Sequence, residues 1–374
     1  MPPVTNKKTS PVWAGPSSPD PNGGVTQSLL GRFLFCRERF RLLVVEGLKP
    51  ADTFSHRLEY GNMWHVCEEA LAQQGSSQPS LLWQRNLTTY CERLCRRYIT
   101  QQDQIDKWYN VCKVQFPLYV DYWAKHQDVV DRTPLLQEQV FHVPYKLPSG
   151  RTVYLRGKWD AVDLIGKGKA AGIYLFETKT KGDINEQQLK RQLTYDLQTM
   201  LYLIALHDQA DFEVPSLGPT TISGVRYNVI RRPLSGGRGS IVQHKPSRSN
   251  PFGEKKEDYY SRLGGLIAEA PQDYFMRWKV EIHSGDIAKF KRECLDPILE
   301  QLCTWWDWVN DQSTEYHTNP GGRFFDANSG IHYRLPYGVY NPLLEGNVSD
   351  LDEHLATGGE LGLTRTDNLF PELG

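Results

Sequence analysis

The sequence predicts a mixed α/β fold, in which a β-sheet is flanked by helices and preceded by an all-helical N-terminal section. Two patterns in the spacing of apolar residues predict this fold. From Gln27 to about His126, apolar residues recur at steps of three and four, the spacing of a buried helix face. From Gln137 onward, apolar and polar residues alternate with a period of two, as they do in strands. Helical spacing and alternation both return later in the chain, so the core mixes the two element types.

The N-terminal part of the chain divides into a tail and a helical section. Residues 1–25 are rich in Pro, Gly, Ser, Thr and Asn and have few apolar side chains. Because such a segment buries too little apolar surface to offset the entropy of ordering, we expect a flexible tail. The helical section is assigned to residues 26–130. Its predicted helices cover residues 28–45, 55–74, 81–102 and 103–126.

The core, assigned to residues 131–345, is predicted to begin with a three-stranded antiparallel meander. The first turn of the meander is centred on Ser149, in the sequence Pro148-Ser149-Gly150. One long amphipathic helix over residues 184–209 is then expected to cover the sheet. The predicted strands are residues 138–147, 152–165, 173–180, 220–230 and 274–284.

A last helix is predicted to begin with Ser284 as its cap and to run to about Asp311, with a kink at Pro297. The closing residues, 346–374, are assigned to an acidic C-terminal tail. From Glu345 to the end there are seven Asp or Glu residues and a single Lys or Arg residue, Arg365. This tail is a candidate segment for docking a protein partner.

Composition narrows the class of protein. The 374 residues carry a formal net charge of −1 and contain no apolar run long enough to cross a membrane. The start of the chain lacks the apolar block of a signal peptide, and the seven cysteines are scattered and odd in number. We therefore expect a cytoplasmic protein with free thiols and no membrane association.

Charge is distributed unevenly along this nearly neutral chain. The segment from Arg226 to Arg262 contains nine Lys or Arg residues and three Asp or Glu residues. This segment is either a solvated run of charge or a surface that contacts phosphates.

The residues that suggest chemistry lie in the meander. Glu177 and Lys179 are two apart on one strand, so their side chains leave the same face, while Thr178 points away. Pairing with the preceding strand brings Asp160 roughly opposite Thr178. A one-residue change of register or a bulge would put all three functional groups on one face, and the sequence leaves that register open.

Two neighbouring carboxylates repel each other unless a cation neutralises them, and Mg²⁺ or Mn²⁺ prefers carboxylate and water oxygens. A lysine beside such an ion can orient the attacking water, while the ion stabilises charge on a phosphoryl oxygen. Asp160, Glu177 and Lys179 together therefore indicate hydrolysis of a phosphodiester.

Three ordered motifs carry a resemblance to a known family. They are G157-K-W-D160, E177-T-K179 and Q198-T-M-L-Y202. Together they resemble the PD-(D/E)XK nuclease superfamily in its RecB-type exonuclease branch, which implies a restriction-endonuclease-like fold. An upstream G61-N-M-W-H65-V-C-E68 resembles the helical histidine motif of the same branch.

The resemblance implies roles for individual residues. It makes His65, Asp160 and Glu177 metal ligands, with a contribution from the backbone carbonyl of Thr178. Gln198 is expected to steady the site and Tyr202 to meet the DNA. Cys36 matches the first ligand of an iron–sulfur cluster found in many of these nucleases. No cysteine follows residue 303 to complete that set, so a cluster is not expected.

The sequence thus predicts a Mg²⁺- or Mn²⁺-dependent deoxyribonuclease. The resemblance favours end-dependent cleavage of single-stranded DNA in recombination, repair or phage DNA processing. Two alternatives stay open: a non-catalytic DNA-binding module that keeps the nuclease fold, and a structure-specific endonuclease. Cleavage assays would distinguish them.

Overall fold

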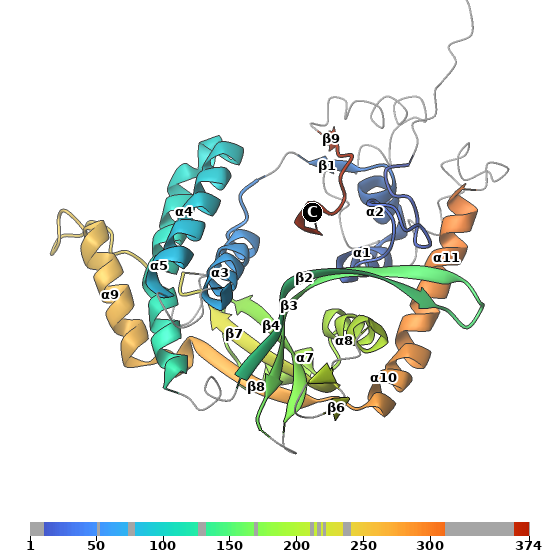
Figure 1. Ribbon diagram of the computed structural model, residues 1–374. Helices are drawn as coiled ribbons and strands as arrows, with labels where there is room; N and C mark the ends of the chain where they lie inside the picture. Colours follow the sequence, from blue (N-terminus) through green and yellow to red (C-terminus); the bar gives the residue numbers. More distant parts are fainter. Residues whose placement is uncertain are drawn as a thin grey trace, which may run out of the picture.

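A central five-stranded mixed sheet organises the molecule, a computed structural model (Figure 1). The strand order is β2-β3-β4-β7-β8; β4 and β7 are parallel, and the other neighbours are antiparallel. The described residues are 11–50, 53–73, 79–125, 132–167, 171–209, 213–214, 218–219, 222–234, 241–310 and 363–373. The strands of the sheet are β2 (Arg132–Lys146), β3 (Thr152–Ile165), β4 (Gly172–Lys181), β7 (Ile222–Arg231) and β8 (Phe275–Glu281). Short pairs are formed by β1 (Leu48–Pro50) with β9 (Leu363–Arg365) and by β5 (Glu213–Val214) with β6 (Gly218–Pro219).

The predicted meander and the mixed α/β class are confirmed. The first turn lies where the sequence placed it, with Gly150 at a φ of 88° that favours glycine. From this turn, β2 and β3 form a long hairpin that curves over α8 (Leu197–Gln209) (Figure 1). The parallel step from β4 to β7 is spanned by α7 (Glu186–Leu193) and α8.

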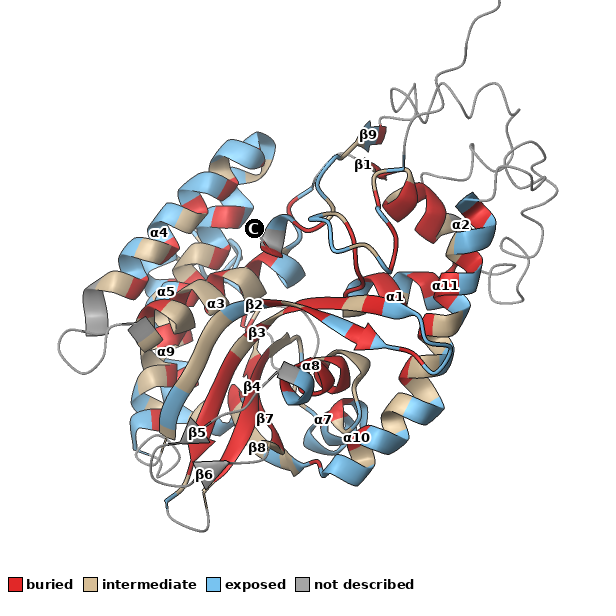
Figure 2. Ribbon diagram, turned by 45° about the vertical axis from the view of Figure 1, so that its right-hand side comes forward, coloured by how far each residue is buried: buried red, intermediate tan, exposed pale blue. Residues whose placement is uncertain are grey.

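Helices cover both faces of the sheet and bury two apolar clusters (Figure 2). One cluster joins the sheet to α1, α7, α8, α10 and α11, and the other joins α3, α4, α5 and α9 around Trp64 and Phe116. The remaining helices are α1 (Gln27–Phe35), α2 (Arg37–Phe40), α3 (His56–Gln73), α4 (Pro79–Arg97), α5 (Gln102–Ala124), α9 (Lys256–Glu269), α10 (Ser284–Phe290) and α11 (Asp296–Asn310). The short helical turns are η1 (Arg41–Val45), η2 (Ile99–Gln101), η4 (Pro271–Asp273), η5 (Lys291–Leu295) and η11 (Pro371–Leu373). No helix in these described ranges is both long and apolar enough to cross a membrane.

Two details of the helix prediction are wrong, and one helix was missed. The single helix expected over residues 184–209 is two helices, because Tyr195 takes a φ of 101° that no helix contains. The last helix is capped by His283, which forms a capping box with Asp286, and not by Ser284. Its irregular turn is the π-helical η5, just ahead of Pro297. The sequence analysis also missed α9 altogether.

The N-terminal segment is not a flexible tail where the structure describes it. Trp13 is fully buried, and its indole nitrogen donates a hydrogen bond to the carbonyl of Gly24. The expectation is wrong for residues 11–25 because Trp13 supplies an apolar anchor that composition alone understates. Residues 1–10 lie outside the described ranges.

The described end of the chain is likewise part of the folded body. Phe370 is buried, and the guanidinium of Arg156 lies over its ring at 4.5 Å from the centroid. The side chain of Asn22 donates a hydrogen bond to the carbonyl of Asp367, which joins the two ends. Residues 363–373 therefore do not form a separate tail. The acidic stretch 346–362 lies outside the described residues.

Candidate active site

The site begins where β3 and β4 separate. Their pairing runs from Ile165↔Gly172 to Ala161↔Phe176, and the same register continued would set Asp160 opposite Glu177. The sequence analysis expected Thr178 there, so the register is shifted by one residue. At this point the backbone N–H of Thr178 donates a hydrogen bond to Oδ2 of Asp160 at 2.8 Å. The carboxylate thus accepts a strand hydrogen bond that a backbone carbonyl ordinarily accepts.

Glu177, Lys179 and Gln198 form a closed triangle of hydrogen bonds. Nζ of Lys179 donates to Oε1 of Glu177 at 2.6 Å and to Oε1 of Gln198 at 2.7 Å. Nε2 of Gln198 donates to the same oxygen of Glu177 at 3.0 Å. The structure therefore brings three of the predicted site residues together, from β4 and from the first turn of α8.

The protonation state of Lys179 follows from its surroundings. Burial lowers the pKa of this amine, but the charges of Glu177 and Asp160 outweigh burial and raise it. In this arrangement the side chain is therefore an ammonium group that donates hydrogen bonds. It is suited to orient a nucleophile or to stabilise negative charge, and not to remove a proton as a free amine.

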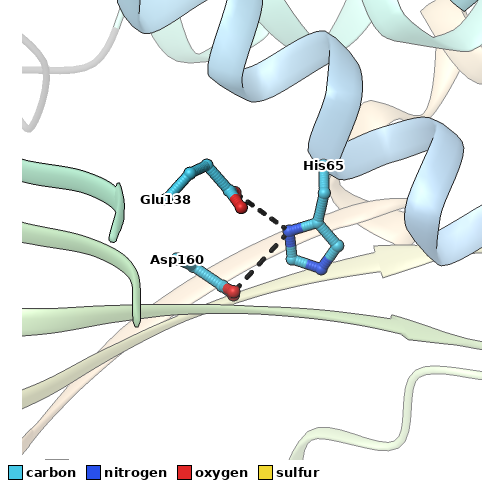
Figure 3. Close-up of side chains that lie close together, drawn as sticks. All are labelled: His65, Glu138 and Asp160. Carbon is cyan, nitrogen blue, oxygen red and sulfur yellow. Dashed lines mark ion pairs between the residues drawn. The ribbon is translucent and has the colours of Figure 1, made fainter. Parts of the chain in front are cut away.

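His65, Glu138 and Asp160 form a second cluster, which Figure 3 shows. Nδ1 of His65, on α3, lies 3.5 Å from Oε1 of Glu138 and 3.7 Å from Oδ1 of Asp160. One possible ligand atom from each of these residues lies within 4.8 Å of the other two. The structure thus brings His65 to Asp160 as expected. The third member of this compact group is Glu138, however, and not Glu177.

The sequence analysis missed Glu138, although a signal for it was present. The pairs Gln137↔Ala161 and Gln139↔Trp159 bracket Glu138 and set it opposite Asp160. A hairpin centred on Ser149 gives the same pairing. The backbone of Glu138 has a φ of 48°, and its side chain forms a 2.6 Å ion pair with Lys158.

Positive charge holds the acids of this cluster together. Burial lowers the pKa of His65, but the carboxylates of Asp160 and Glu138 raise it to about 10, so the imidazole is protonated. Burial, with repulsion from Glu177 and Glu138, raises the pKa of Asp160 to about 8 against the pull of His65. An imidazolium thus carries the positive charge that a bound cation would supply.

Thr178 points to the opposite face of β4, as expected from its place between Glu177 and Lys179. Its hydroxyl donates to Oε2 of Glu68 at 2.8 Å. The other oxygen of Glu68 accepts hydrogen bonds from Tyr119 at 2.6 Å and Asn228 at 2.9 Å. This buried network ties α3 and α5 to the sheet, and therefore fixes the height of His65 above Asp160.

Tyr202 lies beneath the β2–β3 hairpin. Its ring meets Phe141 edge-on, with centroids 5.3 Å apart, and a Cβ atom added at Gly157 would lie 2.6 Å from the ring. The absence of a side chain at Gly157 is what makes room for the tyrosine. The indole of Trp159 also donates a hydrogen bond to the backbone carbonyl of Tyr202. A contact of Tyr202 with DNA stays a prediction.

The residues present fit a divalent cation. Oε2 of Glu177 is buried and accepts no hydrogen bond from the described residues, and the side chain as a whole is 1% exposed. A buried carboxylate oxygen without a donor is costly unless a cation or water meets it. The imidazole and carboxylate donors of His65, Glu138, Asp160 and Glu177 are those that divalent ions prefer. A cavity of about 330 Å³ opens at Glu138 and Asp160 and leaves room for a substrate beside them.

Carboxylates, an imidazole and a buried ammonium group at one end of a mixed sheet suit a metal-dependent hydrolase of phosphate esters. The sequence profile of the PD-(D/E)XK nuclease superfamily matches residues 25–301. Because the match spans well over half of the chain, the protein belongs to this superfamily. Membership identifies it as a nuclease and implies DNA as its substrate. A search of curated proteins found no significant match.

Proposed function

We propose that this nuclease is a Mg²⁺- or Mn²⁺-dependent deoxyribonuclease of the RecB-type branch, which degrades single-stranded DNA from an end. The observation that carries the catalytic part is the triangle of Glu177, Lys179 and Gln198 beside the cluster of His65, Glu138 and Asp160. The branch and the end-dependence rest on the three motifs and on the histidine of α3. Recombination, repair or phage DNA processing would use such an activity.

In this proposal His65, Asp160 and Glu177 hold the ion, together with the carbonyl of Thr178, and Glu138 joins them. When bound, the ion supplies Lewis-acid stabilisation of a phosphoryl oxygen and acidifies a coordinated water. Mn²⁺ suits this set well, because it accepts carboxylate oxygens and, as a transition metal, also an imidazole nitrogen.

The side chains divide the remaining work. The ammonium group of Lys179, fixed by Glu177 and Gln198, donates a hydrogen bond to the attacking water and opposes negative charge on the phosphate. Gln198 holds the lysine from α8, so its role is positioning. Tyr202, which packs against Gly157, contacts the DNA strand beside the triangle.

The basic segment contributes fewer DNA contacts than its charge suggests. Arg226 and Arg232 are buried, and Arg232 donates a hydrogen bond to the carbonyl of Thr180. Those two arginines therefore serve the fold, and Arg238 lies outside the described residues. The exposed cations that could meet phosphates are Lys245, Arg248 and Lys255, with Lys256, which also pairs with Asp106 at 3.7 Å.

Cleavage of matched circular and linear DNA tests the proposal. The protein is incubated with single- and double-stranded forms in Mg²⁺, Mn²⁺ or chelator. We expect metal-dependent degradation of linear single strands and little cutting of circles. Equal cutting of circles and linear strands would identify an endonuclease. DNA binding without cleavage in either metal would identify a non-catalytic module.

A further inference from the structure

Two non-glycine residues in the described part of the chain have a positive φ, one within the candidate active site and one three residues before Gln198. They are Glu138, at 48°, and Tyr195, at 101°. Glu138 belongs to the cluster around Asp160. A bulky side chain at positive φ costs free energy and persists only where its surroundings enforce it, as happens most often at functional sites. Tyr195 has no part in the catalytic triangle and needs another explanation.

The chain holds Tyr195 from both sides. Before it, Leu193 is buried and its carbonyl accepts a hydrogen bond from the hydroxyl of Tyr227. After it, the carboxylate of Asp196 accepts a hydrogen bond from the backbone N–H of Thr199 and so caps the start of α8. The break between α7 and α8 is therefore anchored at each end, with Tyr195 between the two anchors.

The side chain of Tyr195 is left open to solvent. It is 55% exposed, and no hydrogen bond, ring pair or cation–π contact within the described ranges involves it. Tyrosines elsewhere in the site are packed; the ring of Tyr202, for example, lies against Phe141. An aromatic ring held outward on a strained backbone has its faces free for a ligand.

The position of Tyr195 identifies that ligand. It lies three residues before Gln198, which contacts Lys179 and Glu177. Three residues of chain span at most about 11 Å, so a nucleic acid strand whose phosphate reaches Lys179 passes near Tyr195. Bases of single strands have free faces and stack on tyrosine with little sequence preference.

We propose that Tyr195 is a stacking platform for a base next to the scissile phosphate of single-stranded DNA. This assignment rests on the proposed nuclease function. It makes Tyr195 a binding residue that places the strand, while the chemistry stays with Lys179 and the metal ligands. Duplex DNA, whose bases are already stacked, gains little from this ring.

Three substitutions at Tyr195 distinguish the effect of the aromatic ring from the effect of the strained backbone. Tyr195→Phe keeps the aromatic face and is expected to bind a single-stranded oligonucleotide as the unmodified protein does. Tyr195→Ala removes the face and is expected to raise the Kd and KM by about 5- to 100-fold, with kcat at saturating DNA nearly unchanged. Tyr195→Gly removes the face and relieves the strain, so it binds as weakly as Tyr195→Ala although its thermal stability is no lower than that of the unmodified protein. Phe35→Ala, at a 42% exposed aromatic residue on α1, is the control and should change nothing.

A direct measurement of base stacking distinguishes the proposed binding role from a purely structural role. An oligonucleotide with 2-aminopurine next to the cleavage position is bound to Lys179→Ala protein, which is expected to bind without cutting. We expect its fluorescence to be quenched, and the quenching to be lost when Tyr195→Gly is added. An oligonucleotide with an abasic nucleotide at that position should bind equally to the Lys179→Ala protein and to the protein that also carries Tyr195→Gly.

Two results would overturn the assignment. If the unmodified protein cleaves DNA and Tyr195→Gly has the same Kd, KM and quenching, the stacking role fails and the nuclease proposal stands. If the unmodified protein binds no single-stranded DNA at all, both proposals fail.

Discussion

Replacing Lys179 by alanine should affect stability and activity in separable ways. Nζ of Lys179 lies 2.6 Å from Oε1 of Glu177, and the two side chains are 18% and 1% exposed. Coulomb's law at an effective dielectric constant of about 20 gives about 6 kcal/mol for unit charges at this 2.6 Å separation. Part of that is recovered when water enters the vacated space. Removing one partner of a buried ion pair typically costs about 3–5 kcal/mol.

We therefore expect Lys179→Ala to lower the free energy of unfolding of the metal-free protein by about 3 kcal/mol or more. Glu177 then keeps only the hydrogen bond from Gln198. Because metal binding is expected to be retained, Mn²⁺ should stabilise both proteins by a similar amount, and the deficit should persist in Mn²⁺. Cleavage should be abolished while metal binding stays largely intact.

Urea unfolding in chelator and in Mn²⁺ measures both stabilities, and calorimetric titration measures metal binding. Lys190→Ala is the matched control, because its 2.6 Å pair with Glu186 is exposed and is expected to contribute less than about 1 kcal/mol. An active Lys179→Ala protein would refute the catalytic role. Equal stability of the two variants in chelator would refute the electrostatic reasoning.

Three further predictions address the neighbouring residues. Glu138→Gln should weaken Mn²⁺ binding at least about 10-fold in a calorimetric titration; unchanged affinity would remove Glu138 from the metal site. The metal-free protein should lose stability as the pH rises from about 6 to 8. Asp160, with its pKa raised to about 8, and His65, with its pKa raised to about 10, keep protons that the unfolded chain has released; urea unfolding in chelator that shows a rise instead would contradict both shifts. Gly157→Ala should cost about 1–3 kcal/mol in thermal unfolding, because its Cβ would lie 2.6 Å from Tyr202; Gly265→Ala, with nothing within 4 Å, is the control and should not destabilise α9.

Much of the fold was predictable because the spacing of apolar residues and the residue types of turns are local properties of the sequence. The meander, the helical N-terminal section and the strands β7 and β8 all follow from spacing that short segments display. The failures came from interactions between distant parts of the chain. Trp13 is ordered by Trp306, whose ring centroid lies 4.8 Å away, and no local pattern indicates that contact. The helix break at Tyr195 was missed because the apolar spacing continues across it from Leu193 to Leu197.

The sequence predicted several residues that the structure brings together at the candidate site, but not their arrangement. Asp160, Glu177, Lys179 and Gln198 carry recognisable motifs, and the structure brings them together. Their register depends on a loop whose pairing no motif defines, and a shift of one residue decides which side chain Asp160 faces. Glu138 belongs to no motif, and only the pairing of β2 with β3 reveals it.

The positions that escaped the sequence analysis share a physical cause. Local rules place glycine at positive φ and continue a helix wherever the apolar spacing continues. Glu138 and Tyr195 break those rules, and each borders a residue that does follow a motif. A sequence whose local preferences all agree needs no such strain, so strain at these two places requires enforcement by the surrounding fold. For Glu138 the enforcing contacts are Lys158 and His65, which hold its carboxylate toward Asp160. For Tyr195 they are the anchors at Leu193 and Asp196, on either side of a ring that is 55% exposed. Under the two proposals made above, Glu138 presents its carboxylate to the metal ion and Tyr195 presents its ring to the DNA strand.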